Sequence, residues 1–149
     1  MLPSFGFVLL YFDFSAFNSS SMKKVIHTEK APAAIGPYSQ AILVNGFLYT
    51  AGQVALIPGT GELDMANIRT ETTRVMQNLK AILSEAGMDF SHVVKTSIFL
   101  SSMDLFAEVN AVYGSYFADG TALPARETVA VAGLPKGVNV EISMVAFKG

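Results

Sequence analysis

Two stretches of the chain repeat apolar residues with the spacing of an amphipathic helix. In residues 66–86 the apolar positions recur every three or four residues, and Gly87 follows where helices commonly end. Residues 104–117 carry a second, more strongly apolar repeat, and Ser102 before it is a suitable N-cap. The two patterns predict two helices. Their apolar positions include Val75, Met76, Leu79, Ile82 and Leu83 in the first, and Leu105, Phe106, Val109, Val112 and Tyr113 in the second.

Six other stretches are short, apolar and bounded by turn-forming residues, which is typical of strands. Asn45-Gly46 separates two of them and is a strong hairpin signal. Strands and helices in this order predict an α+β fold, a β-sheet with both helices on one face. The predicted strands are residues 23–27, 40–44, 47–51, 92–100, 126–132 and 138–147.

Side-chain alternation along the last two strands separates apolar from polar positions. Val140 and Ile142 belong to an apolar face and Glu141 faces away from it, while Val129 and Arg126 lie on opposite faces of their strand. We therefore expect Arg126 and Glu141 to leave the helix-covered core and to point to the same surface. Arginine can bind a carboxylate through two parallel hydrogen bonds, and a lone glutamate can activate a water. A plain Arg126–Glu141 ion pair that closes the sheet explains these residues equally well.

The composition changes this picture in two ways. Hydrophobic residues make up 51% of the 149 residues and charged residues 15%, so we expect apolar surface to be buried between subunits. The sheet face that the helices leave open is expected to carry Ala130, Ala132, Ser143 and Val145.

A net charge of −2 gives no general attraction to nucleic acid. Without cysteine, and with two histidines that show no ligand spacing, no metal site is expected.

Residues 1–21 differ from the rest of the chain. They hold five of the 11 phenylalanines and neither lysine nor arginine, so the basic start of a secretory signal is missing. We interpret them as an N-terminal extension before a single domain at residues 22–149, and we expect a cytoplasmic protein. The small residues Ser19, Ser20 and Ser21 could precede a cleavage site, which keeps secretion open as an alternative.

Several motifs in order along residues 22–148 resemble the RidA (YjgF) family of small enamine/imine deaminases. The resemblance implies a chorismate-mutase-like fold that assembles as a homotrimer, with sites in the clefts between subunits and no cofactor. The motifs are Ala31-Pro32-Ala33-Ala34-Ile35-Gly36-Pro37-Tyr38-Ser39-Gln40, Thr50-Ala51-Gly52-Gln53, Pro124-Ala125-Arg126, Gly133-Leu134-Pro135-Lys136 and Val140-Glu141-Ile142.

The same resemblance assigns roles to individual residues. Arg126 would bind the substrate carboxylate, and Glu141 would orient the attacking water or move protons. Tyr38 would form a wall of the site, although a tyrosine after Gly-Pro is as often simple packing. The remaining residues expected in the cleft are Gly52, which would let the ligand approach the backbone, Asn110, which could equally be an ordinary polar helix residue, and Thr128.

The implied activity is hydrolysis of 2-aminoacrylate and 2-iminobutanoate to 2-oxo acids and ammonia. Two alternatives remain: a non-catalytic sensor of small 2-oxo or imino acids, and an RNA-directed activity, which the acidic pI of about 5.6 disfavours.

Three positions depart from the family pattern. Thr128 stands where many members have cysteine, Ala51 where many have serine, and Glu127 where the residue is usually small and uncharged. The charge of Glu127 is expected to weaken carboxylate binding at Arg126. We expect Lys95 and Lys136 to be solvated charges.

Overall fold

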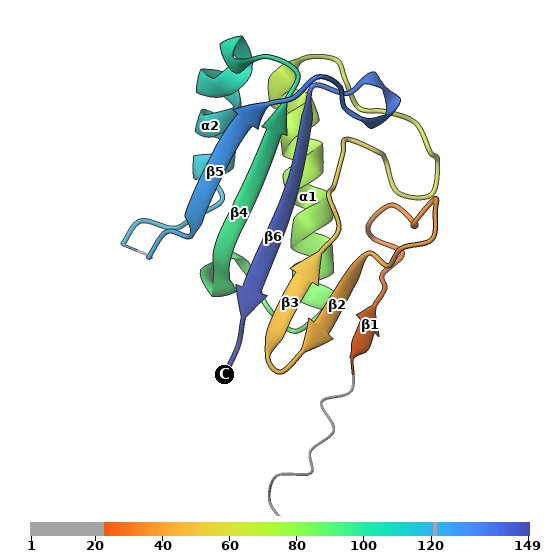
Figure 1. Ribbon diagram of the computed structural model, residues 1–149, viewed down its shortest axis with the longest axis vertical. Helices are drawn as coiled ribbons and strands as arrows, with labels where there is room; N and C mark the ends of the chain where they lie inside the picture. The colour runs from red at the N-terminus through yellow and green to blue at the C-terminus, as the bar shows by residue number, and fades with distance from the viewer. Residues whose placement is uncertain (1–22, 121) are drawn as a thin grey trace, which may run out of the picture.

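The computed structural model describes residues 23–120 and 122–149, and in this part of the chain a single mixed sheet carries both helices on one face (Figure 1). The strand order is β1-β2-β3-β6-β4-β5. The strands are β1 (Lys24–Ile26), β2 (Ala41–Val44), β3 (Phe47–Thr50), β4 (Val93–Leu100), β5 (Ala125–Ala130) and β6 (Val140–Phe147). The helices are α1 (Ile68–Glu85) and α2 (Phe106–Gly114), with 3₁₀ turns η2 (Phe90–His92), η3 (Met103–Leu105) and η4 (Pro135–Gly137). The predicted extension, residues 1–21, lies outside the described residues.

The connections between strands explain why β6 lies in the middle of the sheet. Asn45 and Gly46 have φ values of 50° and 78°, so they form the predicted tight hairpin turn between β2 and β3. β4 and β5 run parallel and are joined by α2, whereas β6 is antiparallel to both β3 and β4. The segment after β5 therefore carries the chain across β4 to the sheet centre instead of forming a hairpin with β6.

The core lies between α1 and the centre of the sheet. The predicted stripe of α1 is fully buried, and Val140, Ile142 and Met144 of β6 face it with at most 2% of their surface exposed. Asn67 caps the helix by accepting a hydrogen bond from the Thr70 amide at 2.9 Å. The second helix is shorter than predicted, because Ser102 caps the 3₁₀ turn η3 through the Asp104 amide and α2 begins after it.

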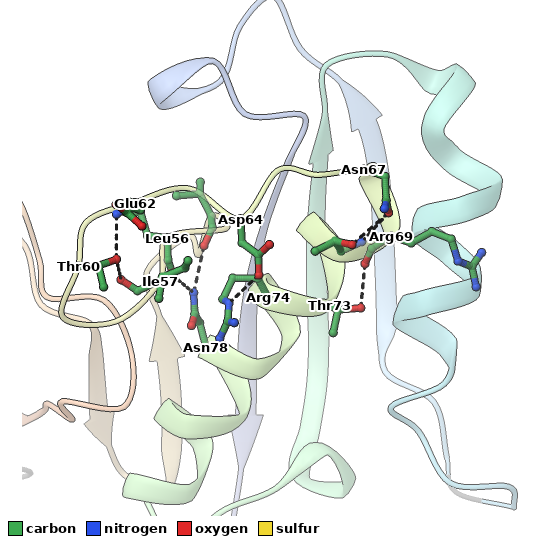
Figure 2. Close-up of polar contacts among 12 residues, drawn as sticks. Leu56, Ile57, Thr60, Glu62, Asp64, Asn67, Arg69, Thr73, Arg74 and Asn78 are labelled. Carbon is green, nitrogen blue, oxygen red and sulfur yellow. Dashed lines mark hydrogen bonds and ion pairs between the residues drawn. The ribbon is translucent and has the colours of Figure 1, made fainter.

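Two polar side chains of α1 lie inside this apolar stripe and bind the segments around the sheet. Glu71 is 1% exposed and accepts hydrogen bonds from the backbone amides of Asn139 (2.6 Å) and Val140 (3.2 Å). Asn78 donates to the carbonyl oxygens of Val54 (3.1 Å) and Leu56 (2.9 Å). Figure 2 shows Asn78 beside the ion pair of Arg74 and Asp64, which also joins α1 to the loop before it. The start of β6 and the 54–66 loop are thereby fixed to α1.

The opposite face of the sheet has no helix over it in the part of the chain that the structure describes, as predicted (Figure 1). Phe47, Tyr49, Val129 and Phe147 are 37–48% exposed there, which is a large apolar area for a free surface. Ala130 was expected on this face, but it pairs with the buried Leu100 and so belongs to the helix side. Neither described helix is long and apolar enough to cross a bilayer.

Candidate functional site

Arg126 and Glu141 lie on opposite faces of the sheet, so the expectation that they share a surface is wrong. Arg126 pairs with Thr96 of β4, and Thr96 is fully buried on the helix side. Glu141 pairs with Phe99, three residues further along β4 and therefore on the open side. Alternation shows which residues of β5 share a face but not which face meets the helices, and that choice depends on register with β4.

On the helix side, Arg126 rests on aromatic rings of α2. Its guanidinium carbon lies 5.2 Å from the centroid of Tyr113 and 5.8 Å from that of Phe106, and its Nη1 donates to Asn110 Oδ1 at 2.6 Å. Arg126 thus pairs with Asn110 and not with Glu141, and among the described residues no carboxylate forms an ion pair with it. The guanidinium group is held in place by Asn110, and its positive charge has no carboxylate partner among the described residues. It is therefore suited to binding the carboxylate of a ligand.

A cavity of about 380 Å³ opens beside this guanidinium. Its floor contains the nearly buried ring of Tyr113, whose hydroxyl donates to Thr96 Oγ1 at 3.2 Å. Burial raises the pKa of Tyr113, so the phenol stays neutral. Thr128 follows Arg126 on the same face, and its buried hydroxyl oxygen has no hydrogen-bond partner among the described residues. The cavity is lined by Asn110, Tyr113, Gly114, Phe117, Leu123, Pro124 and Arg126.

On the open side, Gly52 and Glu141 are in direct contact. The backbones of Gln53 and Ile142 exchange two hydrogen bonds, of 2.8 and 3.1 Å, which brings the preceding Gly52 against the Glu141 side chain. A Cβ atom at Gly52 would lie 1.9 Å from Glu141 Oε1 and 2.8 Å from Cδ. The carboxyl group can occupy this position only because residue 52 has no side chain.

Glu141 and Gly52 line a second cavity, of about 340 Å³, in which Tyr38 forms part of the wall. The Tyr38 ring is 51% exposed, and its hydroxyl accepts a weak hydrogen bond of 3.4 Å from the Ile35 amide. Burial raises the pKa of the half-buried Glu141 carboxyl. A carboxyl group with a raised pKa binds a proton more readily than an ordinary one, and beside an open cavity it can accept a proton and return it.

Gln40 fixes the loop that carries Tyr38, a role that the sequence analysis did not assign. It is 2% exposed, accepts from the Thr28 amide at 2.7 Å, and donates to the carbonyl oxygens of Thr28, Ala31 and Pro32. Glu71, which holds the start of β6 one residue before Glu141, was missed in the same way. A polar residue on an otherwise apolar stripe or at the start of a buried strand is the available signal for such roles.

Glu127 lies on the open side and is neutralised there. Its carboxylate accepts hydrogen bonds from Lys95 and Ser97 of β4, and these contacts, that of Lys95 first, lower the pKa of Glu127. Lys95 was expected to be a solvated charge and is instead an ion-pair partner. Because Glu127 points away from Arg126 and is paired, its charge disturbs carboxylate binding less than expected. Among the described residues, no group of three or more His, Asp or Glu side chains could hold a metal ion.

Comparison with known proteins agrees with this geometry. A family model described as Endoribonuclease L-PSP matches residues 28–148. The chain belongs to this family, the YjgF/RidA family. A RutC family protein of Synechocystis is 53% identical over 124 residues, covering 83% of this chain and 95% of that protein. The 2-iminobutanoate/2-iminopropanoate deaminase of Mus musculus is 47% identical over 131 residues, covering 88% of this chain and 96% of the mouse protein.

Among solved structures, the Rid family protein YyfA of Yersinia pestis, whose function is described as unknown, matches with a TM-score of 0.82. It is 46% identical, and the match covers 85% of this chain and all of YyfA. The family, and the α+β fold with two helices on one face of a mixed sheet, are therefore confirmed, while the homotrimer stays a prediction. In this YjgF/RidA chain the six predicted site residues form two separate groups. Arg126, Asn110 and Thr128 belong to the helix side, and Tyr38, Gly52 and Glu141 to the open side.

Proposed function

We propose that this protein is a cofactor-independent hydrolytic deaminase of reactive 2-imino acids, with 2-iminobutanoate and 2-iminopropanoate as substrates. The observation that carries the proposal is the Glu141 carboxyl, half-buried against Gly52 in an open cavity and with a raised pKa. The mouse relative named for this activity supports the substrate class. The cytoplasm is the proposed location.

The reaction needs a positioned water and two proton transfers. An enamine such as 2-aminoacrylate first tautomerises to the imine. Water then adds to C2 as Glu141 accepts one of its protons and passes it to the nitrogen, which gives a carbinolamine. Glu141 next accepts the proton of the new hydroxyl group and passes it to the nitrogen, so that C=O forms, the C–N bond breaks and ammonia leaves. One imine and one water give one 2-oxo acid and one ammonia. Arg126 holds the substrate carboxylate and thereby places C2 next to the water.

We further propose that the two groups of residues meet between copies of the chain in a homotrimer. One copy would supply Arg126 with Asn110 and Thr128, and its neighbour would supply Glu141 with Gly52 and Tyr38. The exposed apolar face of the sheet, which carries Phe47, Tyr49 and Val129, supports such an assembly. The uncompensated charge of Arg126 supports it as well, because a carboxylate substrate would complete that half of the site.

A paired measurement on Glu141→Gln tests the proposal. Imine is generated in situ from 2-aminobutanoate with an amino-acid oxidase, and ammonia release is compared with spontaneous hydrolysis in buffer. We expect the wild type to accelerate release, and Glu141→Gln to lose this acceleration while it still binds 2-oxobutanoate in calorimetry. A wild type that binds the oxo acid without accelerating hydrolysis would make the protein a sensor instead.

The family description makes RNA cleavage a second candidate. The chain offers 10 basic against 12 acidic residues, which gives little attraction to a phosphate backbone. Incubation with single-stranded RNA under the same conditions is the direct test. Cleavage that survives Glu141→Gln and Arg126→Ala would point to a site other than the one described.

A further inference from the structure

Lys136 holds an unusual backbone conformation at the rim of the Glu141 cavity. Its φ of 57° and ψ of 14° place it in the left-handed region, where a residue with a side chain is strained and glycine is not. The other described non-glycine residue with positive φ, Asn45, is accounted for by its hairpin turn. For Lys136, which lies between Pro135 and Gly137, the turn alone would be better served by glycine. A side chain at such a position points to a role for that side chain.

Lys136 lines two neighbouring cavities that share part of their walls. One is the cavity of Glu141, and the other, of about 280 Å³, lies between η4 and the 54–66 loop, which run side by side in Figure 1. Ile35, Leu56 and Lys136 line both cavities. A ligand that reacts beside Glu141 can therefore extend past Lys136 into the second cavity.

Among the described residues, Lys136 is the one charged residue that lines the second cavity. Several polar groups of its loop already have partners: the amides of Thr60 and Gly61 donate to the Ile57 carbonyl oxygen, and the Thr60 hydroxyl accepts from the Glu62 amide. None of the ion pairs among the described residues includes Lys136. In the part of the chain that the structure describes, the second cavity thus combines largely apolar lining residues with one lysine that forms no ion pair. Its remaining lining residues are Pro32, Ala33, Ile35, Leu56, Ile57 and Gly59.

We propose that Lys136 binds the distal carboxylate of dicarboxylic 2-imino acids, such as the imine derived from glutamate. This inference rests on the proposed imine hydrolysis and widens its substrate class. The methylene groups of the ligand contact Ile35 and Leu56, and the distal carboxylate meets the ammonium group. The C2 atom stays beside Glu141, so the chemical step is the same as for 2-iminobutanoate. An ammonium group, with three donors on a flexible stem, accommodates such a carboxylate at varied positions.

The test compares two imines on matched variants. L-Glutamate oxidase and a 2-aminobutanoate oxidase generate the two imines in situ with catalase present, and ammonia release gives kcat/KM for each. We expect the wild type to accelerate hydrolysis of both. Lys136→Met, which removes the charge at nearly constant size, should lower kcat/KM about tenfold for the glutamate imine, the loss of one charge-assisted contact, and less than about threefold for 2-iminobutanoate.

Two controls separate charge from folding and from general electrostatics. Lys136→Gly also removes the charge but relieves the backbone strain, so it should show the same selective loss with a melting temperature at or above that of the wild type. Lys80→Met removes an exposed lysine of α1 and should leave both reactions unchanged.

The outcomes are distinguishable. Acceleration of 2-iminobutanoate alone, with the glutamate imine at its buffer rate, overturns the distal subsite and leaves the proposed function intact. An equal loss on both imines in Lys136→Met also overturns it, because Lys136 would then act on the shared part of the substrate. Acceleration of neither imine by the wild type overturns the proposed function itself.

Discussion

Replacement of Gly52 by alanine tests whether the exact position of the Glu141 carboxyl matters. The added Cβ would lie 1.9 Å from Oε1, whereas non-bonded heavy atoms in ordinary contact lie about 3.5 Å apart. The carboxyl group must therefore move by more than an ångström. Since a displacement of about 1 Å in a catalytic group can cost about a hundredfold in rate, we expect kcat/KM to fall by about that factor. Only the end of a half-buried side chain has to move, so the unfolding free energy should fall by only about 1 kcal/mol.

The assay is ammonia release from freshly generated 2-iminobutanoate, with thermal unfolding measured on the same preparations. Gly133→Ala is the matched control, because a Cβ there meets no atom within 4 Å. In the double variant Gly52→Ala/Glu141→Asp the shorter acid should recover part of the lost rate, since it leaves room for the new methyl group. Wild-type kcat/KM in Gly52→Ala would refute the assignment of Glu141 as the proton-transferring group.

Three further predictions use other parts of the site. Arg126→Lys should raise KM about a hundredfold, because an ammonium group cannot reproduce two parallel charge-assisted hydrogen bonds worth about 3 kcal/mol. Formation of the proposed trimer, measured by sedimentation, should not change. Because burial raises the pKa of Glu141, its neutral form is favoured in the fold, and stability is lost as the pH rises from the ordinary carboxyl pKa through the raised one. Glu141→Gln should therefore raise the melting temperature at neutral pH and leave it nearly unchanged at about pH 4, where the wild-type carboxyl is mostly neutral; an equal change at both pH values would contradict the raised pKa. Glu71→Ala leaves the amides of Asn139 and Val140 without their acceptor, so the unfolding free energy from chemical denaturation should fall by about 2–4 kcal/mol. Glu71→Gln should give an intermediate loss. A smaller loss of unfolding free energy for alanine than for glutamine would contradict the role of Glu71 as acceptor.

The parts of the fold that could be predicted from the sequence have strong contrast between apolar and polar positions. The apolar stripe of α1, and the alternation of Val140, Glu141 and Ile142 in β6, each show which face of the element packs against the core. Turning either element to its other face would bury a charge or expose a whole row of apolar side chains. The Asn45-Gly46 turn was equally clear, since few other dipeptides adopt its conformation.

The orientation of β5 could not be predicted in the same way. Its residues are small or polar on both faces, and all of them are half-buried or exposed at the sheet edge, so alternation carries no burial signal. The decisive information is the parallel register with β4, which places Arg126 beside Thr96 and is a property of the tertiary structure. The motif resemblance assigned these residues to one site, which stays a prediction, and it could not show which face of the sheet each residue occupies.

The separation of Arg126 from Glu141 within one chain bears directly on the proposed chemistry. An arginine in contact with a carboxyl group lowers the pKa of that group and loses much of its own attraction for other anions. The fold avoids this: Arg126 is held by Asn110 and two aromatic rings, while burial raises the pKa of Glu141 on the other face of the sheet. The guanidinium therefore remains available to a substrate carboxylate, and Glu141 remains able to exchange a proton. In the proposed trimer the Arg126 guanidinium of one copy would face the Glu141 carboxyl group of its neighbour only across the cleft. There the substrate carboxylate, rather than Glu141, would neutralise the arginine.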